Sequence, residues 1–211
     1  MTPSVQQAAT TSHLSRQDWL DAGLRLLIEE GVEAVRITRL AEALGVTRGS
    51  FYWHFKDRGA LLQGLIEVWS AKNTAAMIES VEDAVSLAHG ILALFEVWID
   101  PQRFDPRLDQ AMRDWARRSS AMRDAVTEAD EARVAAITSL FQRFGYKMPE
   151  AFIRARIVYF TQVGYYALDL NERLTQRLPY LEAYYEGFTG REIAPETAEA
   201  FRKRHAVPAA G

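Results

Sequence analysis

The 211-residue sequence predicts an all-α protein, because three features of its patterning are helical. Apolar residues recur at three- and four-residue spacing, which places them on one face of a helix. Capping residues precede these runs, and glycine or proline follows them. No segment shows the alternation of apolar and polar residues that is typical of a half-buried strand. The chain is long enough for a small domain joined to a larger one.

The first predicted helix starts after Ser15. The run Ser15-Arg16-Gln17-Asp18 has the form of a capping box, in which the serine hydroxyl and the Asp18 carboxylate satisfy backbone N–H groups of the first turn. Gly31 suits the left-handed position that ends a helix. The apolar residues between them form one stripe: Leu20, Leu24, Leu27 and Ile28.

Two short helices and one long helix are expected next. We expect Thr38 to cap a helix that Gly45 ends, and Thr47 to cap the following helix. Asp57 is expected to cap a long helix from Arg58 to about residue 80. The residues expected in the core of this segment are Leu40, Leu44, Phe51 and Phe55.

The later helices are located by caps and helix breakers. Asp105-Pro106 is a cap followed by proline at the first helical position, where the missing N–H costs nothing. The expected helices cover about residues 82–99, 106–119, 120–144, 149–171, 174–188 and 195–205. Residues 1–13 and 206–211 are expected to be disordered, with a DNA contact as the alternative for the first arm.

Composition narrows the functional classes. The formal net charge is −3, so no global field attracts the protein to nucleic acid, and any DNA affinity has to come from a local basic cluster. The absence of cysteine excludes disulfides and thiolate chemistry. The uncharged apolar stretches 84–95 and 157–168 are too short to span a bilayer, and the N-terminus lacks a signal peptide. We therefore expect a soluble, cytoplasmic protein without cofactor or metal.

The segment from Thr38 to Lys56 has the layout of a helix-turn-helix motif. Two short helices flank Gly45-Val46, and the second presents its N-terminus to solvent, as a helix entering a major groove ~12 Å wide requires. Between Arg36 and Arg58 the sequence has five basic and two acidic residues. This local positive charge is placed to meet phosphates.

The run Leu44-Gly45-Val46-Thr47-Arg48-Gly49-Ser50-Phe51-Tyr52-Trp53-His54-Phe55-Lys56-Asp57-Arg58 resembles the signature of the tetracycline-repressor (TetR) family. The resemblance covers about residues 14–65, and the remainder matches the family only in length and helical character. It implies that Arg48 reads bases and that Gly49 lets the backbone approach the groove. The DNA-binding residues implied are Thr38, Thr47, Arg48, Gly49, Ser50, Tyr52, Trp53, His54, Lys56 and Arg58. Alternatives remain: Tyr52 and His54 as ordinary surface residues, and 56–58 as a solvated turn.

The resemblance also implies a second domain that encloses an effector pocket and forms a homodimer. The candidate pocket residues are aromatic, Met and polar side chains: Trp69, Asn73, Met77, His89, Phe95, Trp98, Met112, Trp115, Gln162 and Tyr166. His89 has a hydrogen-bonded core histidine as its simpler interpretation. The segment 157–168 is apolar nearly all round, which favours burial on two sides, the second by another subunit. The candidate interface residues are Tyr165, Leu178, Leu181 and Tyr185.

The sequence thus predicts a three-helix DNA-binding head at 14–56 and a helical effector-binding and dimerisation domain at 57–205. The expected function is repression at an inverted-repeat operator in double-stranded DNA, relieved by a small molecule. An activator or an effector-independent regulator on the same scaffold is the first alternative. The second is an all-helical enzyme with a site near His89 and Trp98, although no catalytic motif is present and we expect no enzyme.

Overall fold

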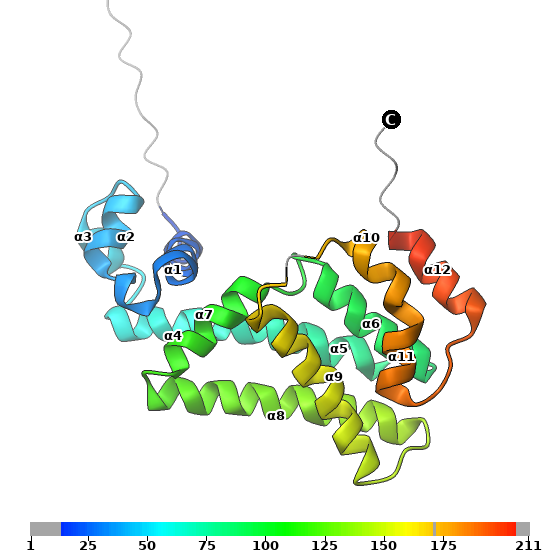
Figure 1. Cartoon of the computed structure of the whole chain (residues 1–211). Helices are drawn as coiled ribbons and strands as arrows, with labels where there is room; N and C mark the ends of the chain where they lie inside the picture. The colour runs from blue at the N-terminus through cyan, green and yellow to red at the C-terminus, as the bar shows by residue number, and fades with distance from the viewer. Residues whose placement is uncertain (1–13, 171, 206–211) are drawn as a thin grey trace, which may run out of the picture. The chain divides into compact units, whose positions relative to one another are not determined.

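The computed structural model describes residues 14–170 and 172–205, and every regular element in these ranges is helical (Figure 1). The predicted all-α fold is therefore confirmed. The expectations for 1–13, Asn171 and 206–211 lie outside the described residues. Contacts divide the chain into two compact units, the first ending at Leu65 and the second starting at Ile66. No helix among the described residues has the length and hydrophobicity needed to cross a bilayer.

The first unit contains α1 (Arg16–Glu30), a 3-10 turn η1 (Val32–Ala34), α2 (Ile37–Ala43), α3 (Arg48–Phe51) and the start of α4 (Arg58–Trp69). The predicted capping box is present: the Asp18 N–H donates to the Ser15 hydroxyl at 3.3 Å, and the Ser15 N–H donates to the Asp18 carboxylate at 2.6 Å. Gly31 ends α1 as predicted, but its φ of +83° and ψ of 173° are not the left-handed helical conformation that was expected.

The core of this unit explains why it extends beyond the predicted limit at residue 56. Leu61 and Leu65 of α4 are fully buried. A Cβ atom added to Gly23 of α1 would lie 3.1 Å from the Leu65 side chain, so the glycine permits close packing of α1 against α4. The first two turns of α4 thus belong to the head.

Three local expectations differ from the structure. Thr38 is the second residue of α2, whose N-cap is Arg36. Thr47 is the N-cap of α3, but its hydroxyl makes no capping hydrogen bond. The long helix starts as predicted, with the Asp57 carboxylate accepting from the Ala60 N–H at 2.8 Å, but it changes to a π-helical turn at Ser70–Ala75.

The second unit contains the end of α4, that π-helical turn and the remaining helices: α5 (Ala76–Glu82), α6 (Leu87–Ile99), α7 (Pro106–Ala116), α8 (Ser120–Arg143), α9 (Glu150–Ala167), α10 (Leu174–Arg177), η3 (Leu178–Tyr180), α11 (Leu181–Thr189) and α12 (Pro195–His205). The helix expected from residue 82 begins at Leu87, because the Ser86 hydroxyl accepts from the His89 N–H and caps it there. The helix expected at 174–188 is in three pieces, since Pro179 cannot donate a helical hydrogen bond.

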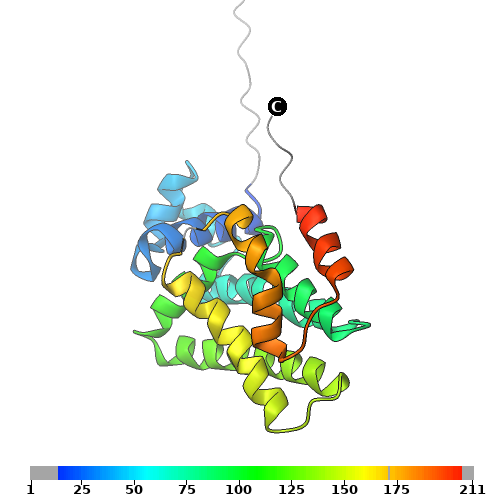
Figure 2. The same cartoon turned by 45° about the vertical axis from the view of Figure 1, so that its right-hand side comes forward.

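Helix α8 is the centre of this unit. Figures 1 and 2 show α9 crossing α8, and the two helices are in contact. On another side α6 approaches so closely that a Cβ on Gly90 would lie 2.4 Å from Leu140 Cδ1. Leu140 and Phe141 are fully buried as a result. Glycine at position 90 thus sets the distance between α6 and α8.

Candidate nucleic-acid interface

The turn between α2 and α3 fixes the recognition segment. Gly45 has a φ of +67°, a conformation that favours glycine, and the Val46 N–H donates to the Ala41 carbonyl oxygen at 2.9 Å. Phe51 then packs edge-to-face on Trp19 at 5.3 Å and stacks on Phe55 at 5.5 Å. These inward-pointing rings leave the intervening side chains on the surface.

Most of the predicted DNA-binding residues are exposed on this segment. Trp53 is 88% exposed and Tyr52 is 60% exposed. Three of the predicted residues are half-buried: Ser50, His54 and Arg58. The others are exposed: Thr38, Thr47, Arg48, Gly49, Tyr52, Trp53 and Lys56. The Trp53 indole and the Tyr52 ring are thus available for contacts at the surface. Leu44, expected in the core, is only half-buried.

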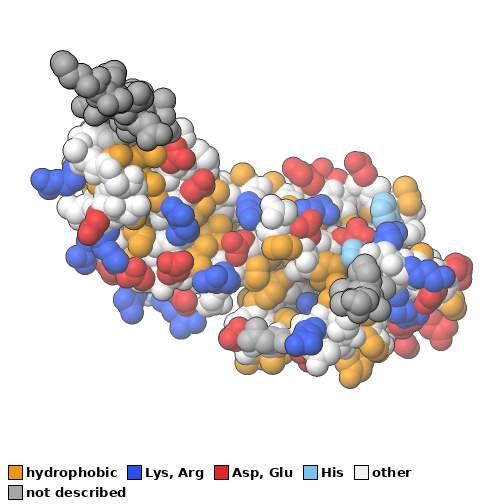
Figure 3. All heavy atoms as spheres, turned by 90° about the horizontal axis from the view of Figure 1, so that it is seen from above, with side chains coloured by type: hydrophobic (Ala, Val, Ile, Leu, Met, Phe, Trp, Pro, Cys, Tyr) orange, Lys and Arg blue, Asp and Glu red, His pale blue; other side chains and the backbone are white. Residues whose placement is uncertain are grey.

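Ion pairing within the head removes some of the five local cations from this surface. The Arg39 guanidinium makes two hydrogen bonds to the Glu30 carboxylate, at 2.7 and 2.8 Å. The Arg36 side chain donates to the Glu33 carbonyl oxygen. On the visible face of the first unit, at the left of Figure 3, basic side chains (blue) alternate with acidic ones (red). The surface is therefore mixed in charge.

Arg58 has a role that the sequence did not indicate. Its guanidinium donates to the carbonyl oxygens of Val35 and Val32, at 2.6 and 2.7 Å, and so satisfies backbone acceptors at the end of η1. This binds α4 to the segment before α2 and directs the charge inward. Within the described part of the chain, Arg48 and Lys56 are the cations of this segment whose side chains make no hydrogen bond or ion pair.

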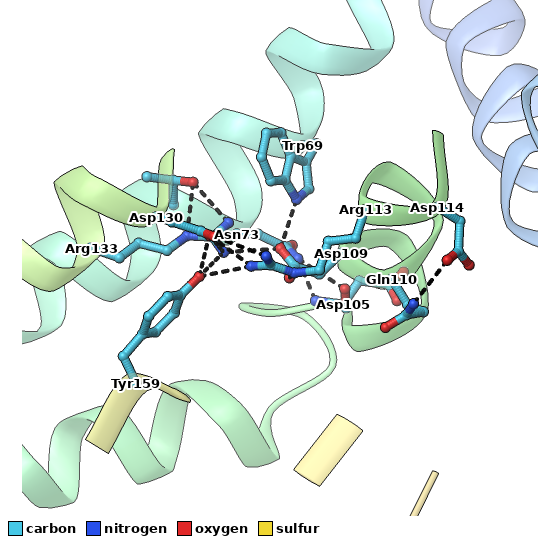
Figure 4. Close-up of polar contacts among 11 residues, drawn as sticks. Trp69, Asn73, Asp105, Asp109, Gln110, Arg113, Asp114, Asp130, Arg133 and Tyr159 are labelled. Carbon is cyan, nitrogen blue, oxygen red and sulfur yellow. Dashed lines mark hydrogen bonds and ion pairs between the residues drawn. The ribbon is translucent and has the colours of Figure 1, made fainter. Parts of the chain in front are cut away.

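In the second unit, Trp69, one of the predicted pocket residues, belongs instead to a largely buried polar network (Figure 4). Asp109 is its centre: its Oδ1 accepts from Trp69 Nε1 at 2.9 Å and from Arg133 Nη1 at 3.0 Å, and its Oδ2 accepts from Arg113 Nε at 2.9 Å. Burial raises the pKa of Asp109, but the charges of Arg133 and Arg113 outweigh burial and hold that pKa below its ordinary value. The carboxylate therefore stays ionised inside the protein.

The network extends from Asp109 across four helical segments. Arg113 forms a bidentate pair with Asp130 at 2.7 and 2.9 Å. The Tyr159 hydroxyl donates to Asp130 at 2.6 Å and accepts from Arg133 at 2.9 Å. Arg133 also donates to the Thr74 hydroxyl in the π-helical turn. Two guanidinium groups face two carboxylates, so the network is neutral.

The structure thus assigns packing roles to many of the candidate pocket residues. Asn73 is fully buried and exchanges two hydrogen bonds with the backbone of Asp105. Met77, Trp98 and Met112 are buried and Trp115 is half-buried. His89 is exposed, and its Nδ1 accepts from the Val85 N–H at 3.3 Å, so its interpretation as a core histidine is wrong. Phe95 and Gln162 line a cavity between helices, near Tyr166, whose hydroxyl donates to the Trp98 carbonyl oxygen.

Two of the four residues predicted for the dimer interface are buried within their own subunit. Leu181 and Tyr185 are each 4% exposed because they pack in the core of their own subunit. Tyr165 and Leu178 are half-buried and line the same cavity as Gln162. Instead, α9 exposes an apolar face that the sequence range 157–168 only partly covered: Phe152, Ile153, Ile157 and Phe160. These four residues lie at i, i+4 and i, i+8 spacings that begin one helical turn before residue 157. That spacing is the sequence signal that could have located this exposed face.

No group of three or more potential metal-ligating side chains in residues 14–170 and 172–205 is arranged to hold a metal ion.

Comparison with known proteins agrees with the geometry of the head. The family model described as "Bacterial regulatory proteins, tetR family" matches residues 20–65. The chain is 46% identical over 55 residues to the HTH-type transcriptional regulator AcrR of Shigella flexneri, a match that covers 26% of this chain and 24% of that protein. It is 32% identical over 120 residues to the tetracycline repressor protein class C of Escherichia coli, covering 56% of this chain and 50% of that protein. The chain thus spans a quarter to a half of the length of these curated relatives.

A solved structure extends the likeness to the whole fold. The reduced form of Escherichia coli NemR superposes with a TM-score of 0.64 at 17% identity, covering 85% of this chain and 98% of that chain. At this identity the likeness concerns the fold alone. The sequence match in the head confirms the resemblance found at residues 44–58, and the fold match concerns the helical architecture.

Proposed function

We propose that the chain is a sequence-specific DNA-binding transcriptional regulator of the TetR family, on the basis of the family match at residues 20–65. The observation that supports this most is the exposure of Arg48, Tyr52, Trp53 and Lys56 around a short helix anchored by Phe51. Apart from Arg48 and Lys56, the basic side chains of this segment are used inside the head. Arg48 and Lys56 therefore remain available to contact DNA.

Each exposed residue has a role that follows from its chemistry. Arg48 in the first turn of α3 matches the geometry of a guanine edge, whose O6 and N7 accept two hydrogen bonds. Gly49 lets the helix backbone approach the groove, because no side chain intervenes. Lys56 and the hydroxyls of Thr47 and Tyr52 suit phosphate oxygens, which position the protein without selecting sequence.

The proposal includes a homodimer formed through the exposed face of α9. Ile153, Ile157 and Phe160 are each nearly half exposed and recur along one side of the helix. A two-fold pair of such faces would bury this apolar surface and would present two heads to an inverted repeat. A small-molecule effector acting on the second unit completes the proposal. Relatives are named repressors, and repression with release by the effector is the mode we propose, with activation as its alternative.

The experiment is selection of DNA fragments by the purified full-length protein, followed by binding isotherms on the selected site. We expect an inverted repeat bound in a salt-sensitive manner. Arg107 of α7 offers a matched control, because it is exposed in the other unit: Arg107→Ala should bind as the wild type does. Failure to enrich any sequence would contradict the proposal. The enzyme alternative is less well supported: Trp98 is buried in the core, and the exposed His89 lines a separate surface cavity with Glu96 and Arg204.

A further inference from the structure

A cavity in the second unit combines apolar walls with two polar groups, a buried amide without a hydrogen-bond partner and a guanidinium without an ion pair. Residues of α6, α9, α10, η3, α11 and α12 line it. We propose that this cavity binds an amphipathic organic acid, whose carboxylate meets Arg177 and Gln162 and whose apolar body lies among Phe95, Leu178, Leu181 and Phe188. The site itself rests on the structure of the second unit, and only its regulatory consequence rests on the proposed function.

The Gln162 side chain indicates a ligand. Gln162 is 7% exposed and lines the cavity, and its Nε2 has no hydrogen-bond partner among the described residues. A buried amide without a partner destabilises a protein, so native structures rarely keep one without a reason. The Gln162 amide interacts with the Tyr166 hydroxyl without the geometry of a hydrogen bond, and that hydroxyl itself donates to the Trp98 carbonyl oxygen at 2.9 Å. An acceptor oxygen on a ligand would satisfy the Gln162 N–H groups.

Arg177 supplies the charge that selects an acid. Its guanidinium carbon lies 4.3 Å from the centroid of the Tyr165 ring, and its side chain forms no ion pair with any described carboxylate. The acidic neighbour Glu172 accepts a hydrogen bond from the Tyr165 hydroxyl at 2.6 Å instead. Stacking holds one face of the guanidinium while its N–H edge stays available for a carboxylate, which it can bind in bidentate fashion.

The remaining walls are apolar and define the body of the ligand. Phe95 and Ile99 come from α6, Leu181 and Phe188 from α11, and Phe201 from α12. Phe95 and Phe188 lie 6.2 Å apart in an edge-to-face arrangement. Such a lining, with few and convergent polar groups, is typical of small-molecule sites and favours a hydrocarbon chain or a ring.

One wall has to move to admit such a ligand. The cavity volume is ≈ 60 Å³, which accommodates about two water molecules. None of the residues of α10 and η3 is buried, whereas α6, α9 and α11 each bury several. Segments with few buried contacts open at the lowest free-energy cost. The segment 174–180 is therefore the wall that we expect to move outward.

Helix α9 offers a route from this site to the buried network. Gln162 lies one helical turn after Tyr159, whose hydroxyl bonds to Arg133 and Asp130. Arg133 in turn bonds to Thr74 of the π-helical turn, which follows α4 directly in the chain. A ligand that displaces Gln162 would therefore act on α9, the helix whose Tyr159 is hydrogen-bonded to the network. This route gives a regulator a means of responding to the ligand.

The test is direct titration of the full-length protein with saturated carboxylates of six to twelve carbons, against the primary alcohols and amines of equal length. We expect one length of carboxylate to bind at least tenfold more tightly than its alcohol and more tightly still than its amine. Arg177→Ala should lower carboxylate affinity to about that of the alcohol, while the exposed control Arg107→Ala leaves affinity unchanged. Equal affinities for acid, alcohol and amine, or an unchanged Arg177→Ala, would overturn the proposal.

A second variant distinguishes a binding role of Gln162 from a structural one. Gln162→Leu removes the unpaired amide, so we expect it to raise the melting temperature of the free protein and to weaken carboxylate binding about tenfold. Lower stability with unchanged binding would show that the amide is satisfied within the protein, and would overturn its assignment. Binding to the selected DNA is measured in parallel. DNA binding without carboxylate binding contradicts this inference alone, and carboxylate binding without DNA binding contradicts the proposed function alone.

Discussion

The guanidinium of Arg58 donates a hydrogen bond to the Val35 carbonyl oxygen at 2.6 Å, and this contact changes how many charges the head can offer to DNA. From the sequence, Arg58 counts as a phosphate contact beside Lys56. In the structure it is half-buried and holds the backbone before α2. Each head then provides two cations, Arg48 and Lys56, to a DNA molecule.

Salt dependence measures this number. Two cationic contacts per head give about four for a dimer, and the log–log slope of affinity against salt should be roughly −3.6. Lys56→Ala should flatten that slope by about 2 and weaken binding to all sequences alike. Arg58→Ala should instead leave the slope near the wild-type value and lower the melting temperature, since it leaves the Val35 carbonyl oxygen without its hydrogen bond. A flatter salt slope for Arg58→Ala would show that Arg58 does contact phosphate.

Base selection is expected to depend on Arg48. Its position in the first turn of α3 and its exposed side chain suit a guanine contact. Arg48→Ala should cost about 1–3 kcal/mol per contact and relax the preference at one base pair of each half-site. Competition binding on a set of singly substituted operators measures both effects. Uniform weakening across all these operators would assign Arg48 to the phosphates.

The oligomeric state should depend on the exposed face of α9. The double change Ile153→Glu and Ile157→Glu places four carboxylates at a two-fold interface, and we expect a folded monomer. Leu181→Glu is the informative comparison, because Leu181 lies in the core of its own subunit and the same change there should unfold the protein. Analytical ultracentrifugation and circular dichroism separate the two outcomes. If the double variant is still a dimer, the interface is formed by a surface other than this face of α9.

The buried network should make stability depend on pH through Asp109. Its folded-state pKa lies below the ordinary value, so its contribution is complete above about pH 4 and decreases as the pH falls towards the folded pKa. Asp109→Asn should lower the free energy of unfolding by about 3–5 kcal/mol at pH 7, because it leaves the buried Arg133 with only the longer, 3.9 Å ion pair to Asp130. The difference from the wild type should shrink as the pH falls below about 4. Urea unfolding at several pH values gives this curve.

A matched control for that experiment is Asp114→Asn. The Asp114 carboxylate pairs with Arg117 at 3.5 Å, and its side chain is 56% exposed. An exposed pair contributes little, so the change should cost less than about 1 kcal/mol at any pH. A loss at position 114 as large as that at position 109 would mean that burial does not determine the effect.

Local signals in the sequence were sufficient for most helix boundaries. Ser15 and Asp57 are followed within three residues by the backbone groups that they cap, so the signal and its partner lie in the same short segment. The prediction that Thr38 caps α2 was wrong because it relied on a hydroxyl cap. Arg36 is the N-cap residue, and its side chain donates to the Glu33 carbonyl oxygen instead of capping the helix. The π-helical turn has no local signal at all, since its Thr74 is held by Arg133, 59 residues later.

Tertiary packing explains the errors in the second unit. Leu181 and Tyr185 form an apolar stripe, but the sequence does not say whether the same chain or a partner covers a stripe. Asp109 and Arg113, at i, i+4, read as an ordinary pair on a helix surface. Only the packing of α7 against α8 buries them. The periodicity of apolar residues does not show which distant segments cover a helix face. Those contacts determine which residues are buried and which line a cavity.

The neutrality of the buried network makes four positions in α7 and α8 mutually dependent. Losing Asp109 or Arg133 unbalances the charge in the interior, and losing Arg113 or Asp130 unbalances it at a partly buried position, so what is tolerated at one position depends on the other three. A complete apolar set of matching volume would avoid that penalty, because buried ion pairs are often replaceable as a group. A library randomised at all four positions should therefore yield two separate populations of folded sequences, one fully ionic and one fully hydrophobic. Single-step evolution between them would have to pass through unstable intermediates.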